Sequence, residues 1–333
     1  MRDTSRGTSA GRAMRLRGTA EKARGSACGK AILVGEHFVV WGGTALAIPV
    51  RSSRLTVSLV ASADSRSRFA LPTGSDDQLA KACRECSRVL RRPGPAAVTV
   101  SVRSNFPHSA GLGSSAAFSV AFVRAWLSLS GKPPDEDVVA QTALEMERVF
   151  HEHASGIDST TIAFETPCYV KTGDRFVVDT PREQEGPRAG FIDVASGGAF
   201  VLADSGGRRA TGAVVRQIAA FARQPKGDTV LARFTGVAEA IALQTANALR
   251  KGDFEYVGLM LNENHYLLSA MGLSTPGLDM LRGQALAHGA FGCKLTGAGM
   301  GGFVLAVTTA ERADGLAVAL RKAGARRVLV ERT

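Results

Sequence analysis

A glycine-containing turn between a strand-like and a helix-like segment is the feature that most constrains the fold of this 333-residue chain. Apolar residues alternate in AVTVSVRSNF (97–106), which predicts a β-strand, and recur at helical spacing in SSAAFSVAFVRAWLSL (114–129). The run PHSAGLG joins the two segments. A helix that begins directly after such a turn presents free backbone N–H groups and a positive dipole end, which together can bind an anion. A serine N-cap at a tight turn is the plainer interpretation.

Two well-known phosphate-binding loops do not fit this turn. A Walker A loop requires Gly-Lys-Ser/Thr, and the turn has no lysine. Gly111, Gly113 and Ala116 have the Rossmann spacing, and Asp135 follows about 20 residues later, as that fold requires. Asp135, however, comes after GKPP and opens a predicted helix, whereas a Rossmann acidic residue ends a second parallel strand. The turn therefore needs another explanation.

Other segments carry groups suited to phosphoryl transfer. In KAILVGEH, Lys30 is either a surface lysine at a strand edge or a cation near reacting oxygens, and Glu36-His37 lies on a predicted turn. In SGIDSTT, Asp158 is predicted in a loop just past a helix, where it either caps a turn or accepts a hydrogen bond from a substrate hydroxyl. The preceding helix carries three glutamates, mostly on a solvated face, of which one could take part: Glu145, Glu147 and Glu152.

The order of predicted elements indicates an α+β protein. Strands and turns are expected over 27–60, a helix over 135–151, strands near 167–180 and 197–206, and mostly helix over 211–288. A polar loop at 180–189 divides the two halves. Near the end, KLTGAGMGGF (294–303) has four glycines within six residues between two apolar strands, and a helix (310–323) and a strand complete the chain. So many glycines predict that the backbone approaches another segment closely.

The positive charge is concentrated at the N-terminus. The net charge is +11, and residues 1–25 contribute six Arg and one Lys against two acidic residues, a net +5. This polar, Gly/Ser/Thr-rich head is predicted to be a disordered, dispensable extension. It is Arg-rich and acid-poor like a transit peptide but has no apolar face, so organelle targeting is the alternative. Nucleic-acid binding would rest on net charge alone, and we expect no nucleic-acid partner.

We expect a cytoplasmic protein with no membrane association. No run approaches the ~18–20 apolar residues of a membrane span, and no apolar segment follows Met1. Five scattered cysteines suit a reducing compartment. Cys83-x-x-Cys86 lies in a predicted helix (77–89) without a second pair or a nearby histidine, which argues against a metal or redox role. His151 and His153 lack the spacing of HExxH.

Three separated motifs, GKAILVGEHFVVWGGTALAIPV, PHSAGLGSSAAFSVAF and KLTGAGMGGFVLAV, together resemble the signature set of the GHMP kinase superfamily over residues 26–308. Within it, Gly-Glu-His followed by Val-Val, SGIDSTT and NENHYLLSAMGLS are most similar to the mevalonate kinase family. The resemblance implies an N-terminal domain of the ribosomal-protein-S5-like domain 2 type, with a left-handed βαβ crossover, and a ferredoxin-like C-terminal domain. We assign 1–25 to the extension, 26–185 to the ATP-binding domain and 186–333 to the C-terminal domain.

The resemblance also implies an activity: Mg²⁺-dependent transfer of the ATP γ-phosphoryl group to the 5-hydroxyl of (R)-mevalonate by a homodimer. Asp158 would be the catalytic carboxylate with Lys30 beside it, and Ser115 and Glu147 would hold Mg²⁺. The implied substrate contacts are Lys30, Glu36, His37, Asp158, Thr211 and Gly297. The implied ATP contacts are Pro107, Ala110, Gly111, Leu112, Gly113, Ser114, Ser115 and Ala116.

Several positions depart from the family pattern. Met300 interrupts the usual glycine run, so its side chain should point away from the site. Trp41 stands where many relatives have histidine, and Tyr169 where an arginine was expected to meet the substrate carboxylate, which leaves Lys171 as a candidate. Another GHMP kinase, acting on a sugar or an isoprenoid precursor, is the nearest alternative. A non-catalytic ligand sensor is a further one, against which the intact Lys30 and Asp158 argue.

Overall fold

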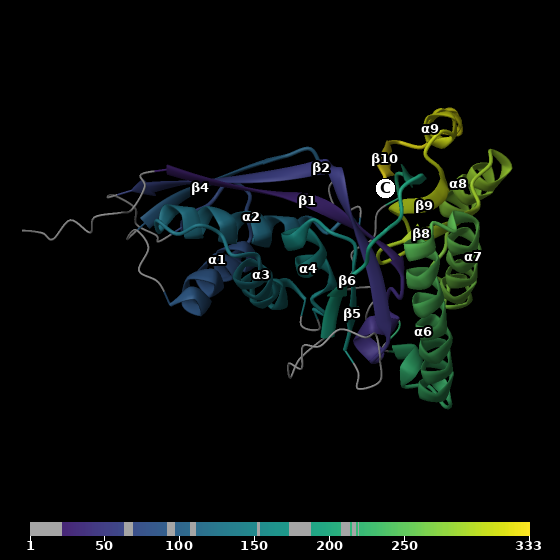
Figure 1. The fold of residues 1–333 in the computed structure, drawn as a ribbon. Helices are drawn as coiled ribbons and strands as arrows, with labels where there is room; N and C mark the ends of the chain where they lie inside the picture. The colour runs from purple at the N-terminus through teal and green to yellow at the C-terminus, as the bar shows by residue number, and fades with distance from the viewer. Residues whose placement is uncertain are drawn as a thin grey trace, which may run out of the picture.

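The computed structural model describes residues 22–62, 69–91, 97–106, 111–151, 154–172, 188–207, 214, 218 and 220–333. They form two domains that lie side by side, each a sheet covered by helices (Figure 1). The predicted α+β architecture is confirmed. The predicted domain divide at 185/186 and the extension over 1–21 lie outside the described residues.

The N-terminal domain is built on two long antiparallel strands, β1 (Lys22–Val34) and β2 (Thr44–Ser62). The 3₁₀ turn η1 (Phe38–Trp41) connects them. Strand β2 also pairs with β4 (Ala97–Ser104) and β5 (Cys168–Lys171), so that the sheet order is β3-β4-β2-β5-β6. Residues 22–25, which we assigned to the extension, belong to β1. That extension therefore ends earlier than predicted.

The remaining strands of this sheet are short. β3 (Phe69–Ala70) runs parallel to β4, and α1 (Asp77–Leu90) connects the two, which makes a βαβ unit. β6 (Arg188–Phe191) pairs with β5 at the other edge. The CxxC cysteines lie in α1 as predicted, and both are buried free thiols.

Helices α1, α2 (Ser114–Leu129), α3 (Glu136–Phe150) and α4 (Ile157–Phe164) cover one face of the sheet (Figure 1). Alternate residues of the strands, such as Val57 and Val100, are buried beneath them in the core. Gly25 allows β1 to pack closely on α2, because a Cβ there would lie 2.0 Å from the carbonyl oxygen of Ala121. Phe122 and Trp126 of α2 stack in the same core.

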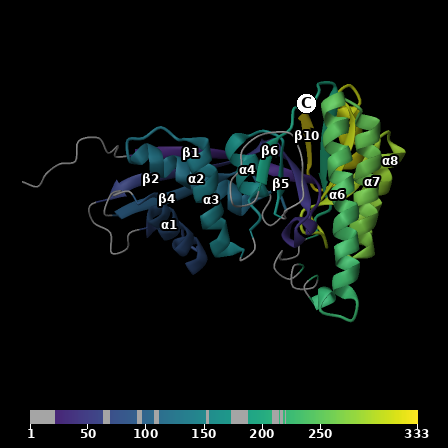
Figure 2. The ribbon, with the colours of Figure 1, turned by 60° about the horizontal axis from the view of Figure 1, so that its bottom comes forward.

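The C-terminal domain has an antiparallel sheet of order β10-β7-β9-β8. Its strands are β7 (Gly198–Asp204), β8 (Gly292–Thr296), β9 (Phe303–Thr309) and β10 (Val328–Arg332). Its helices are α6 (Gly227–Lys251), α7 (Phe254–Ala270), α8 (Pro276–Ala287) and α9 (Ala313–Lys322). The long helices α6 and α7 lie side by side (Figure 2). β8 and β9 flank the glycine-rich turn, as predicted. None of the helices that the structure describes is both long and apolar enough to span a bilayer.

Polar contacts join the two domains. Glu36, after β1, forms an ion pair with Lys294 of β8, and the two side chains are 1% and 0% exposed. Lys171 of β5 pairs with Glu239 of α6. The backbone N–H of Ser52 in β2 donates to Glu331 of β10 at 2.9 Å. With these contacts, the glycine-rich turn of the C-terminal domain lies against Gly111, in the turn before α2.

Candidate active site

The glycine turn before α2 leaves the start of that helix without a side-chain cap. The N-cap is Gly113, at φ 73°, and none of the described side chains caps the helix. Ser114 and Ser115 are therefore the first helical residues and do not serve as its N-cap. The plainer interpretation, a serine-capped helix, is not the one the structure supports. The backbone N–H groups and the positive dipole end of α2 point out of the turn, as an anion site requires.

Lys30 is buried against this turn. The residue is 4% exposed, and its backbone N–H donates to the carbonyl oxygen of Leu112 at 3.1 Å. Its Nζ donates to the carbonyl oxygen of Gly111 at 3.3 Å and lies 3.1 Å from Asp158 Oδ2. A Cβ at Gly113 would lie 3.0 Å from Cε of Lys30, so this glycine makes room for the lysine. The interpretation of Lys30 as a surface residue is therefore excluded.

Asp158 lies in the first turn of α4, and the prediction that it lies in a loop is wrong. The N-cap of α4 is Gly156 in the left-handed conformation, with φ 86°, so Asp158 does not cap the helix. The Asp158 side chain is 26% exposed, whereas that of Lys30 is 5% exposed. The pair thus consists of a buried cation and a carboxylate that a ligand can reach.

Glu147 is the buried member of the glutamates on α3. It is 3% exposed, whereas Glu145 forms a surface ion pair with Arg148. Burial, followed by the negative charge of Asp158, raises the pKa of Glu147 to about 8. The charge of Lys30 and hydrogen bonds from Ser159 act in the opposite direction. A cation beside this carboxylate would favour its ionised form.

The two residues predicted to hold Mg²⁺, Ser115 and Glu147, both offer oxygen donors. A carboxylate and the hydroxyl of Ser115 at the start of α2 are hard oxygen donors, which Mg²⁺ prefers. Within the described residues, no group of three or more His, Cys, Asp or Glu side chains could hold a metal ion.

The glycine-rich turn of the C-terminal domain packs directly on the phosphate-loop candidate. Gly297 has φ 85°, and a Cβ there would lie 3.2 Å from the Cα of Gly111. Only the absence of a side chain allows the two backbones to approach so closely. The side chain of Met300 packs against the core of the C-terminal domain, which agrees with the expectation that it points away from the site.

His37 also contacts this turn. Its Nε2 lies 3.0 Å from the carbonyl oxygen of Ala298, so the Nε2–H tautomer donates to it. Burial lowers the pKa of His37 to about 4, and the charge of Lys294 acts in the same direction, while the hydrogen bond to Ala298 opposes them. His37 is therefore neutral at physiological pH.

Some predicted residues lie elsewhere. The carboxylate of Glu36 is paired with Lys294 and accepts a hydrogen bond from the amide of Asn264 at 3.4 Å, so its contacts join the two domains. Lys171, the candidate for the substrate carboxylate, is 1% exposed and paired with Glu239. Three predicted contacts lie outside the described residues: Pro107, Ala110 and Thr211.

Sequence reasoning overlooked Lys294, Asn264 and Ser159. Lys294 and Asn264 lie within the motifs KLTGAG and NENH, and Ser159 directly follows Asp158. Lysine is almost never fully buried, so nothing in the sequence marked Lys294 as a core residue.

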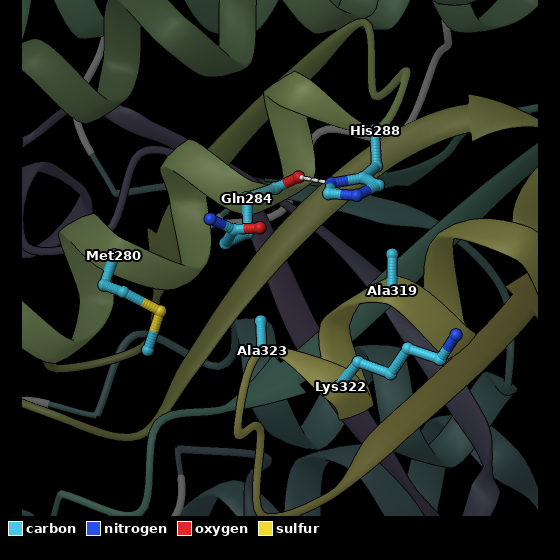
Figure 3. A pocket seen from close by; sticks show the side chains of 6 residues that line it. All are labelled: Met280, Gln284, His288, Ala319, Lys322 and Ala323. Carbon is cyan, nitrogen blue, oxygen red and sulfur yellow. Dashed lines mark hydrogen bonds between the residues drawn. The ribbon is translucent and has the colours of Figure 1, made fainter.

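A separate shallow pocket of about 280 Å³ lies between α8 and α9 (Figure 3). It is lined by Met280, Gln284, His288, Ala319, Lys322 and Ala323. None of these is a predicted site residue, and its histidine is bonded to the backbone of its own helix.

Comparison with known proteins shows to which protein family the chain belongs. The model of the GHMP kinases N terminal domain matches residues 75–166, and that of the GHMP kinases C terminal domain matches residues 245–326. The chain belongs to the GHMP kinase family and is an ATP-dependent kinase.

Within that family, the chain matches mevalonate kinases. It is 35% identical over 301 residues to the mevalonate kinase of Aeropyrum pernix, which covers 85% of this chain and 87% of the relative. The structure of L. major mevalonate kinase in complex with R-mevalonate has a TM-score of 0.76 at 23% identity, covering 94% and 97% of the two chains. The Streptococcus pneumoniae phosphomevalonate kinase has a TM-score of 0.77 at 18% identity, covering 94% and 100%. The fold alone thus does not distinguish the substrates.

Proposed function

We propose that this chain is a mevalonate kinase, which transfers the γ-phosphoryl group of ATP to the 5-hydroxyl of (R)-mevalonate. The observation that carries the proposal is the Lys30–Asp158 pair beside the uncapped start of α2. Extensive identity to a curated mevalonate kinase supports the choice of mevalonate within the family. The solved structures of similar fold do not help to identify the substrate, because they include both a mevalonate kinase and a phosphomevalonate kinase.

The phosphate site would be formed by the backbone of residues 111–115 and the N-terminal end of α2. The free N–H groups there are suited to the β- and γ-phosphates of ATP, and the turn around Gly297 supports the loop from behind. Pro107, Ala110 and Ala116 would complete the contacts to ATP. Mg²⁺ held by Ser115 and Glu147 would neutralise phosphate charge during transfer.

Asp158 would orient the 5-hydroxyl and accept its proton as the hydroxyl oxygen bonds to the γ-phosphorus. The bond from phosphorus to the bridging oxygen then breaks, and ADP leaves. Lys30, 3.1 Å from Asp158, would stabilise the negative charge that develops on the transferred group. His37, Thr211 and Gly297 would contact mevalonate. Glu36 would act indirectly, through the residues that it contacts, Lys294 and Asn264.

The test is mevalonate-dependent ADP formation by the purified full-length protein, measured in parallel with phosphomevalonate and galactose. We expect turnover with mevalonate alone. Asp158→Asn should lower kcat by ~10²–10⁴-fold, the usual contribution of a positioned general base, and leave ATP binding nearly unchanged. Glu145→Gln, on the exposed face of α3, is the matched control and should keep full activity. Preference for another acceptor, or an Asp158→Asn variant with most of its kcat, would contradict the proposal.

The compartment and assembly are part of the same proposal. Five free buried cysteines support a cytoplasmic, reducing setting. The resemblance supports a homodimer, which light scattering on the purified protein would test.

A further inference from the structure

The open face of the N-terminal sheet contains a hollow that the proposed kinase site does not use. It has a volume of about 440 Å³ and is formed by β1, β2 and β4. Helices α1 to α4 cover the opposite face of these strands (Figure 1). We call it the basic hollow; its lining residues are Lys22, Ala23, Arg24, Thr56, Ser58, Leu59, Val60, Ser101 and Arg103.

The strand register brings the polar lining residues together. Arg24 of β1 lies opposite Ser58 of β2, which lies opposite Ser101 of β4. In the adjacent row, Thr56 lies opposite Arg103. Lys22 and Arg24 are two residues apart, hence roughly 7 Å along β1, and β4 is two strands, about 10 Å, away from β1. Long Lys and Arg side chains can span these distances and meet at one ligand.

The cations of the basic hollow have no carboxylate partner among the residues that the structure describes. None of the ion pairs between described residues involves Lys22, Arg24 or Arg103, all of which are exposed. By contrast, Arg54 on the same sheet is paired with Glu165. This end of the sheet therefore carries uncompensated positive charge, which an anion would offset.

The composition of the lining selects the kind of anion. Arginine forks and hydroxyl donors match phosphate oxygens. The lining has no aromatic side chain on which a nucleobase could stack, which disfavours a single-stranded nucleic acid. The enclosed volume suits a compact ligand. We propose that the basic hollow binds an oligophosphate, the di- or triphosphate group of a small molecule, at a site separate from the Lys30–Asp158 centre.

The test measures binding of tripolyphosphate to the full chain by calorimetry at low salt. A non-hydrolysable ATP analogue is present at saturation, so that the active site is filled. We expect one site per chain, and the double variant Arg24→Gln/Arg103→Gln should weaken it at least tenfold. The matched control removes the same charge from exposed positions at the end of α6, Arg250→Gln/Lys251→Gln, and should change the affinity less than twofold.

Three outcomes would overturn the proposal: no binding by the wild type, equal affinity in wild type and Arg24→Gln/Arg103→Gln, or an equal loss in the control variant. A thermal melt that matches the wild type establishes that the variants are folded. A thymidine 20-mer serves as a competitor. If it binds tightly and tripolyphosphate does not, the surface is a nucleic-acid site and the proposal fails.

Discussion

At the scale of the residue, the three ionisable groups that we propose for phosphoryl transfer differ in burial. Lys30 and Glu147 are almost fully buried next to a partly exposed Asp158. Their residue types and motif positions could be read from the sequence. Their burial could not, because lysine and glutamate are usually exposed and each of these residues is covered by segments distant in the chain.

His37 makes the stability of the protein depend on pH. Its pKa is lowered to about 4 in the folded protein, so between about pH 4 and 6.5 the unfolded chain binds a proton that the folded chain does not. The free energy of unfolding should therefore fall as the pH drops from 6.5 towards 4. His265, with a pKa also lowered to about 4 by burial, adds to the effect.

His37→Asn should reduce this pH dependence by at most about 1.4 kcal/mol per pH unit, the limit for one proton. Asparagine is suitable because it tolerates the positive φ of 64° at this position. Urea denaturation of both proteins from pH 5 to 7 measures the difference. If the free energy of unfolding depended on pH equally in both proteins, His37 would bind its proton equally well in the folded and the unfolded state.

At the scale of the element, most strands and helices were predictable because their side-chain periodicity is local. The start of β1 was not, because its core-facing residues are Ala23 and Gly25, which give no apolar signal. The helix α4 was missed for a related reason. It begins after Gly156 in a left-handed conformation and has no capping side chain to mark it.

The contact between the two glycine turns yields a prediction. In Gly297→Ala, the methyl group would lie 3.2 Å from the Cα of Gly111, closer than the optimal carbon–carbon distance of about 3.5–4.0 Å, so the phosphate loop must shift. We expect a rise in the KM for ATP or a fall in kcat, of tenfold or more.

Gly289→Ala is the matched control. Gly289 has φ 88° but no atom within 4 Å of an added Cβ. Both variants should lose stability by roughly 1–2 kcal/mol through backbone strain, and only Gly297→Ala should lose activity. Steady-state kinetics and denaturation of the two variants measure these losses. Equal kcat and KM values in the two variants would refute a functional role of the contact between Gly297 and Gly111.

At the scale of the whole molecule, the site depends on contacts between the two domains. Glu36 and Lys294 are 258 residues apart in the sequence and fully buried together. Sequence patterns could place both residues in motifs but not in contact, since pairing at such separation follows from the tertiary fold. The resemblance to GHMP kinases located the three motifs that meet at the site, which local periodicity alone would not have brought together.

Breaking this buried pair should destabilise the protein more than breaking a surface pair. Lys294→Met leaves the Glu36 carboxylate buried without a cation, which should cost about 3–5 kcal/mol. Adding Glu36→Gln should recover part of the loss, because no unpaired charge then remains. Asp314→Asn, which breaks the exposed pair with Arg332, should cost only about 0–1 kcal/mol. Urea denaturation of the wild type, both single core variants, the double core variant and Asp314→Asn tests this, and simple additivity of the two core changes would contradict the coupling.

The buried thiols have a practical consequence. Burial raises the pKa of Cys28, Cys83, Cys168 and Cys293 to about 12 and that of Cys86 well above its usual value. The reactive thiolate is therefore almost absent from the native protein, and alkylating reagents can modify a cysteine only when its surroundings open. Four thiols report on the N-terminal domain and Cys293 on the C-terminal one, so mass-resolved alkylation would time the opening of each domain without any engineered label.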